Sequence, residues 1–168
     1  MLGAWGSIRK FEIFVFSFPS PAYDGGLRVT KPPYQILEHP ADIGLKIYGR
    51  TLPELFENAG RGLVALALGT PDTLPRERLL LSGAGDDREE MLVSWLNDIL
   101  YYMDAEGWLF CDFHVTRIGE NAVEAEGWGE RRDATKGSHA IPVKAVTYHQ
   151  ISVHEIEDGW EAVVYVDI

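Results

Sequence analysis

The last two residues of the chain bring together two groups that bind cations. Asp167 carries a side-chain carboxylate, and Ile168, as the last residue, carries the α-carboxylate. The alternating pattern stays apolar up to Ile168, so we expect the chain end to be docked. Two adjacent carboxylates repel each other unless a cation lies between them, and hard cations such as Ca²⁺ and Mg²⁺ prefer oxygen ligands. The residues alone leave a second interpretation open, in which Asp167 is an ordinary solvated carboxylate.

A C-terminal hairpin is expected to position this end. Two alternating segments flank the Asp-Gly pair at 158–159, a pair typical of a two-residue turn in which both central residues have positive φ. Counting outward from such a turn pairs His149 with Ile168 and Gln150 with Asp167. The pattern therefore predicts that the chain end lies against His149 and Gln150.

A basic segment precedes this hairpin in an otherwise acidic chain. Within 131–144 there are five basic or imidazole side chains and one acidic one, namely Arg131, Arg132, Lys136, His139 and Lys144 against Asp133. A loop of this charge could contact a phosphate or an acidic partner, or it could simply be solvated. Both interpretations remain open from the residues.

Helix caps and hydrophobic periods predict the elements that support these groups. Thr51 with Glu54, and Asp87 with Glu90, form capping boxes ahead of helical apolar stripes that end at Gly69 and Gly107. The remaining elements are expected to be strands at 34–37, 43–48, 78–82, 108–118, 122–130, 144–156 and 160–168. This order predicts an α+β fold of two layers, with two helices packed on one face of a mainly antiparallel mixed sheet.

Composition indicates one soluble globular domain. The chain has 168 residues, 15 basic and 26 acidic side chains, a formal net charge of −11 and one cysteine. A single cysteine excludes an internal disulfide framework and is typical of the cytoplasm. The acidic balance argues against strong direct binding of nucleic acid, and no apolar run is long enough to span a membrane. Residues 1–33, rich in glycine, proline and aromatics, are expected to be a poorly ordered extension or the product of a misassigned start, with the domain at 34–168.

Generic enzyme motifs are absent from the chain. There is no phosphate-binding loop, nucleophile elbow or His-Glu-x-x-His helix. Cys111 and His114 lie three residues apart in an expected strand, so their side chains point to opposite faces and do not form a thiolate pair. We expect Cys111 to belong to the core.

Four segments together resemble the archease family. They are Glu-His-Pro-Ala-Asp-Ile-Gly at 38–44, Gly-Trp-Gly-Glu at 127–130, Val-Lys-Ala-Val-Thr-Tyr-His at 143–149 and Val-Asp-Ile at 166–168. The resemblance covers about residues 34–168. It implies a non-catalytic protein that activates an RtcB-type RNA ligase in tRNA splicing or RNA repair, by promoting guanylylation of the ligase and its multiple turnover.

The resemblance also implies a divalent metal site. Archeases bind an ion described as calcium, with magnesium and manganese as alternatives, through residues that correspond here to Asp42, Asp167 and Ile168. His39, Lys144 and His149 match other recurrent positions and are expected beside the metal or facing the ligase. Pro40 stands where threonine is commoner in the family.

Two other functions remain open at this point. A metal-dependent phosphohydrolase or nuclease could use the same carboxylates, although no nucleophile or general base is evident. A chaperone-like module for RNA-modifying enzymes such as a tRNA methyltransferase is the alternative that the resemblance itself offers.

Overall fold

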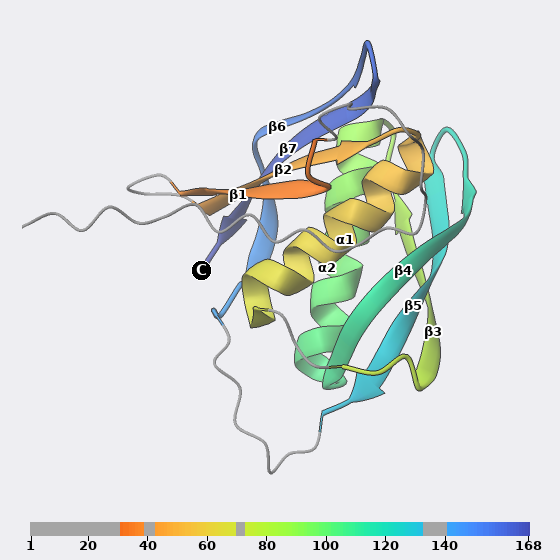
Figure 1. The fold of residues 1–168 in the computed structure, drawn as a ribbon, viewed down its shortest axis with the longest axis vertical. Coiled ribbons are helices and arrows are strands. Elements are labelled where there is room, and N and C mark those ends of the chain that lie inside the picture. The colour runs from red at the N-terminus through yellow and green to blue at the C-terminus, as the bar shows by residue number, and fades with distance from the viewer. Residues whose placement is uncertain (1–30, 39–42, 70–72, 133–140) are drawn as a thin grey trace, which may run out of the picture. The chain divides into compact units, whose positions relative to one another are not determined.

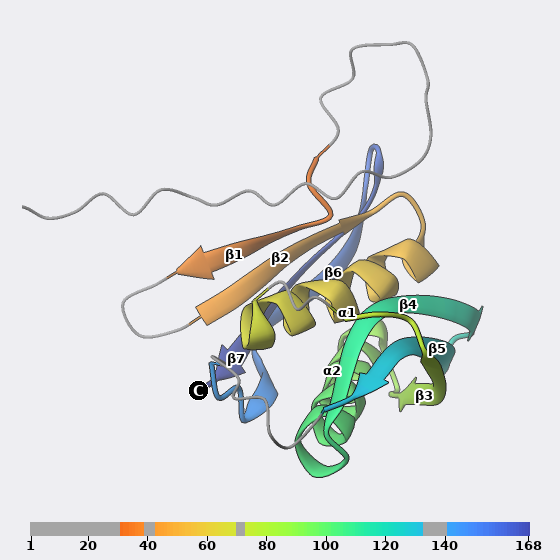
Figure 2. The same cartoon turned by 60° about the horizontal axis from the view of Figure 1, so that its bottom comes forward.

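Two helices lie between two antiparallel sheets in the computed structural model (Figures 1 and 2). The structure describes residues 31–38, 43–69, 73–132 and 141–168, and the fold below is that of the unit Pro33–Ile168. The elements are β1 (Tyr34–Glu38), β2 (Ile43–Gly49), α1 (Leu52–Leu68), β3 (Glu77–Ala84), α2 (Arg88–Ala105), β4 (Trp108–Ile118), β5 (Ala122–Arg131), β6 (Ala145–Ile156) and β7 (Gly159–Asp167). One sheet has the order β1-β2-β7-β6 and the other β3-β5-β4. The extension expected at 1–33 lies outside the described residues except for its last three positions.

Both helices begin at the predicted caps. The Thr51 hydroxyl accepts a hydrogen bond from the Glu54 N–H at 3.3 Å, and the Asp87 carboxylate accepts one from the Glu90 N–H at 2.8 Å. The Glu54 carboxylate in turn accepts from the N–H of Arg50, one residue before the cap, at 3.0 Å. These bonds satisfy N–H groups that the first helical turn leaves without a partner.

The α+β class with two helices is confirmed, but the helices separate two sheets where one sheet in two layers was expected. All described strand pairs are antiparallel, so no sheet is mixed. Helix α1 packs against β2 on one side and β4 on the other, and α2 packs against β6 and β3. The reason is visible in α2, where the consecutive residues Met91, Leu92 and Val93 are all buried. Consecutive helical residues point about 100° apart, so this helix needs apolar cover on more than one side.

The core lies around α2, between the sheets. Trp95, Phe56 and Phe113 are almost completely buried, and the Trp95 ring meets the Phe113 ring edge-on at 5.8 Å. The Trp95 indole N–H donates to the Phe56 carbonyl on α1 at 3.1 Å, so this large and fully buried side chain also has its polar atom paired. This central layer fixes the two helices, which in turn position the sheet that carries the chain end.

Candidate functional site

The chain end is docked against the start of β6. The Lys144 N–H donates to the Asp167 carbonyl at 2.8 Å, and the Lys144 Nζ donates to the backbone oxygen of Ile168 at 3.0 Å. Ala145 pairs with Asp167 in the sheet register. Asp167 and Ile168 are both exposed, with Ile168 at 48%. The predicted docking is therefore confirmed, and it leaves both residues accessible to a partner or an ion.

The predicted register of the hairpin is wrong. His149 and Gln150 do not pair with the chain end, because the turn lies one position earlier than expected, with Ile156 opposite Gly159. Of the described residues at this turn, Gly159 has a positive φ of 133°, while neither Glu157 nor Asp158 does. A larger shift follows between Thr147 and Ser152, where β6 departs from regular pairing. Together these changes replace His149 and Gln150 with Lys144 and Ala145 beside the chain end.

His149 nevertheless lies on β6, the strand that pairs with β7, and β7 ends at Asp167. Its ring meets the Tyr165 ring edge-on, with 5.9 Å between the ring centroids. Tyr165 lies directly across Gly44 of β2, where an added Cβ would approach the tyrosine ring to 3.0 Å. The glycine of the Glu-His-Pro-Ala-Asp-Ile-Gly segment thus leaves room for Tyr165, and Tyr165 supports His149.

Two predicted site residues, His39 and Asp42, lie outside the described residues. The described neighbour of Asp42 is Ile43, and Ile43 pairs with Val166, the residue before Asp167. The strand that begins directly after Asp42 and the strand that ends at Asp167 are therefore adjacent at this register. That adjacency comes from the β2–β7 ladder and was not evident from sequence spacing.

The chemistry of the described donors suits a hard cation in part. Asp167 offers carboxylate oxygens and Ile168 a backbone oxygen, and both are exposed. The Lys144 ammonium already contacts Ile168 and supplies one positive charge there. Within the described ranges, no three His, Cys, Asp or Glu side chains lie close enough together to hold a metal ion. A complete site would therefore need ligands beyond those that the structure describes, since Ca²⁺ takes six to eight oxygens.

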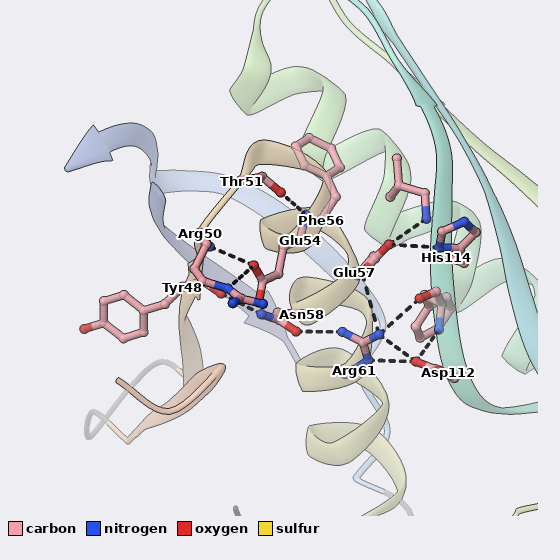
Figure 3. A network of polar contacts seen from close by, with 12 residues as sticks. Tyr48, Arg50, Thr51, Glu54, Phe56, Glu57, Asn58, Arg61, Asp112 and His114 are labelled. Carbon is pink, nitrogen blue, oxygen red and sulfur yellow. Dashed lines mark hydrogen bonds and ion pairs between the residues drawn. The ribbon is translucent and has the colours of Figure 1, made fainter. Parts of the chain in front are cut away.

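A second polar cluster joins α1 to β4 (Figure 3). The Arg61 guanidinium donates to Asp112 Oδ1 at 2.8 Å, to Asn58 Oδ1 at 2.7 Å and to the Phe113 carbonyl at 3.2 Å. Glu57 accepts from the Val115 N–H at 2.9 Å. These bonds connect α1 to β4, the edge strand of the second sheet, so the role of this cluster is to stabilise the packing of the helix on the sheet.

Cys111 and His114 make separate contacts on β4. The Cys111 thiol donates to the Trp128 carbonyl at 3.3 Å, whereas His114 Nδ1 lies 3.5 Å from Glu57 Oε1. Burial and the nearby Asp112 carboxylate raise the pKa of the Cys111 thiol, which disfavours the reactive thiolate. The two side chains therefore have different partners, but β4 is irregular between Phe110 and Asp112, so the strict alternation behind the prediction does not hold there. Cys111 is partly buried and is not a full member of the core, contrary to the expectation.

An open cavity of about 520 Å³ lies beside α2, β3 and β5. Its lining includes Ser82, Ser94, Asp98 and Glu124. Ser94 and Asp98 accept hydrogen bonds from N–H groups of β3, so these polar atoms close a sheet edge. None of the predicted site residues within the described ranges lines this cavity.

Sequence reasoning missed the part that α2 plays at the site. The Asn97 amide donates to the Val146 carbonyl at 3.1 Å and accepts from the Val146 N–H at 3.0 Å. Val146 pairs with Val166, next to the chain end. A polar residue on a mostly apolar helix face was the available signal, but its partner lies 49 positions away. The other missed residue is Tyr165, which gave no sign of its contact with His149.

The fold and the docked chain end define a class of α+β proteins with two helices between antiparallel sheets. In the comparison with known proteins, the model of the Archease protein family (MTH1598/TM1083) matches residues 34–168. The protein archease of Aeropyrum pernix is 38% identical over 135 residues, which are 78% of this chain and 94% of that protein. The protein archease of Methanosarcina barkeri is 37% identical over 143 residues, which are 80% of this chain and 95% of that protein. The chain belongs to the archease family.

Solved structures agree with this assignment. The solution structure of Methanobacterium thermoautotrophicum protein 1598 matches with a TM-score of 0.70 at 26% identity, covering 81% of this chain and 99% of that one. A crystal structure from Thermotoga maritima, titled an archease and possible chaperone, shares the fold with a TM-score of 0.56 at 22% identity. Within the described residues, neither helix combines the length and the apolar character that crossing a bilayer requires.

Proposed function

We propose that this protein is a non-catalytic activator of an RtcB-type RNA ligase and that its chain end is the activating element. Family membership supports the choice of partner, because the match extends over residues 34–168. The observation that carries the proposal is the docking of an exposed Asp167 and Ile168 by Lys144. A fixed and accessible acidic end can enter or contact a partner's active site without first being ordered.

The proposed cofactor is a divalent cation, calcium, with magnesium or manganese as alternatives. Asp42, Asp167 and the α-carboxylate of Ile168 are its proposed ligands. Support comes from the pairing of Ile43 with Val166, which joins the strands that lead to Asp42 and Asp167. The ion would neutralise the carboxylates and give the chain end a fixed charge. Lys144 would balance the remaining negative charge, and His39 and His149 would lie beside the metal or face the ligase.

The partner is proposed to provide the chemistry and the grip on RNA. A net charge of −11 disfavours direct binding of a polyanion by this chain. Among the described residues, the Cys111–His114 pair that could have suggested catalysis makes separate structural contacts. We also propose that the protein acts in the cytoplasm together with the ligase, in tRNA splicing or RNA repair.

The test is multiple-turnover joining of RNA ends by substoichiometric cognate ligase, with and without this protein. The substrate carries a 3′-phosphate and a 5′-hydroxyl, and GTP and manganese are present. We expect a large increase in turnover that Asp167→Asn abolishes. Asp158→Asn is the matched control, because Asp158 is an exposed carboxylate in the turn at the opposite end of the same hairpin. A glycine added after Ile168 should also abolish activation if the α-carboxylate is a ligand.

Other outcomes would assign a different function. A wild-type protein without effect on a competent ligase would refute the proposal. Co-purification with a tRNA methyltransferase in the absence of a ligase would favour the chaperone-like module. Turnover of phosphate esters by this protein alone would favour a hydrolase.

A further inference from the structure

Strand β6 contains three residues more than its partner strand can match. Val146 pairs with Val166 and Val153 pairs with Ala162. Between these fixed pairs β6 advances seven residues and β7 only four. At about 3.4 Å per residue, four residues of β7 span about 14 Å, whereas seven extended residues would span about 24 Å. The excess length must leave the ladder.

Helix α2 fixes both ends of this segment. Asn97 makes two hydrogen bonds with the Val146 backbone, and the Glu89 carboxylate accepts from the Val153 N–H at 2.9 Å. Glu89 and Asn97 are eight residues apart, or about 12 Å along a helix. This distance is close to the length of the four residues of β7 and much shorter than seven extended residues of β6. Helix α2 and strand β7 together therefore force the middle of this β6 segment out of the ladder.

The extruded residues form what we call the β6 bulge, Tyr148–Gln150. All three are exposed, and the Tyr148 ring is the second most exposed of the described large hydrophobic side chains, at 63%. Gln150 has a left-handed backbone, with φ of 50°. The base of the bulge is tied down by Thr147, whose hydroxyl donates to the Tyr165 carbonyl at 3.3 Å and accepts from the His149 N–H at 3.4 Å. Bulges of this kind re-aim side chains and are common beside functional sites.

The β6 bulge and the chain end share one face of their sheet. On β7 the alternate residues Ala162, Val164 and Val166 are buried toward the helices. Tyr165 and Asp167 therefore point to the opposite face, two residues or about 7 Å apart. Because His149 packs on Tyr165, a partner that reaches Asp167 also meets the bulge.

We infer that the β6 bulge is a second contact with the partner of the chain end, and that it supplies affinity while the chain end supplies activation. This inference rests on the proposed function, so its partner is the RtcB-type ligase. Exposed tyrosines on a fixed backbone are frequent hot spots, because they bury a large area with little loss of side-chain entropy. The net charge of −11 over the whole chain favours a basic surface on the partner and disfavours RNA as the occupant.

The test separates affinity from maximal activation. The ligase is titrated with full-length protein, and both the half-saturating concentration and the maximal turnover are measured. We expect Tyr148→Ala to raise the half-saturating concentration about tenfold or more and to leave the maximal turnover unchanged. Asp167→Asn should instead lower the maximum. Tyr101→Ala, which removes a tyrosine 57% exposed on α2, is the matched control and should change neither quantity.

The outcomes distinguish failure of the inference from failure of the proposed function. If wild-type protein does not stimulate the ligase, the proposed function fails, and the inference fails with it. If Asp167→Asn is inactive but Tyr148→Ala titrates like wild type, the bulge inference is overturned and the function stands. A lowered maximum at unchanged half-saturation would also overturn it. Equal urea midpoints for wild type and the Tyr148→Ala variant confirm that any change arises from lost contacts and not from unfolding.

Discussion

Replacing Asn97 by alanine is expected to destabilise the sheet that carries the chain end. The amide of Asn97 makes two hydrogen bonds with the backbone of Val146, at 3.1 and 3.0 Å. Val146 is only 3% exposed, so water does not readily replace these bonds. Asn97→Ala therefore leaves a buried N–H and a buried C=O without partners.

The expected loss follows from the cost of those two groups. Each buried polar group left unpaired costs about 1–3 kcal/mol, so with two such groups we expect the free energy of unfolding to fall by about 2–6 kcal/mol. That is a large part of the roughly 5–15 kcal/mol that stabilises a typical domain. For a domain of this size it corresponds to a Tm lower by roughly 6–20 °C.

Urea unfolding followed by circular dichroism is the assay, with a lower midpoint and an unchanged m value as the expected result. Asn97→Asp is the informative control, since its carboxylate still accepts from the Val146 N–H but faces the Val146 carbonyl with a second oxygen. Ionisation is disfavoured there, so the pKa of this carboxyl would be raised in the folded state. The aspartate variant should accordingly recover stability only as the pH falls below that raised pKa, whereas the alanine variant should not recover. An alanine variant within 0.5 kcal/mol of wild type would refute the reasoning.

Two further predictions concern β6 and β4. Because φ is 50° at Gln150, Gln150→Gly should leave the free energy of unfolding unchanged or raise it by up to about 1 kcal/mol, and Gln150→Ile should lower it by about 1–2 kcal/mol. Urea midpoints measure both changes. An isoleucine variant as stable as wild type would contradict the strain argument. The Cys111 thiol should react with iodoacetamide more slowly at pH 8 in the folded protein than in the unfolded one, because burial raises the pKa of the thiol and keeps it protonated to higher pH. Mass spectrometry of labelling time courses measures the two rates. Equal rates would show that the thiol is as acidic and as accessible in the folded protein as in the unfolded chain.

The N-terminal ends of the two helices were predictable from the sequence. Thr51 and Asp87 cap α1 and α2 through bonds to N–H groups three residues away. Such bonds depend on local backbone geometry alone, so residue type and spacing are sufficient to predict them. The same holds for the strand pattern and for the expectation that the apolar chain end at Ile168 is docked.

The register of the hairpin was not predictable in this way. Counting from the turn assumes that both strands advance in step, and β6 breaks that assumption between Thr147 and Ser152. The break is imposed by Asn97 and Glu89, which hold β6 from a helix about 50 to 65 positions earlier in the chain. No local signal encodes a distance between two elements that meet only after folding.

The division is a physical one. Hydrogen bonds within a few residues and the alternation of apolar side chains are written in the sequence, and they determined the helices, the strands and the docked end of this protein. Three other features depend on how these elements pack. They are the number of sheets, the residue that contacts the chain end within the molecule, and the exposure of Tyr148 and His149. Packing is a property of contacts between distant segments. The contacts of Lys144 with Asp167 and Ile168, and the position of the β6 bulge beside them, therefore became evident in the folded protein and not before.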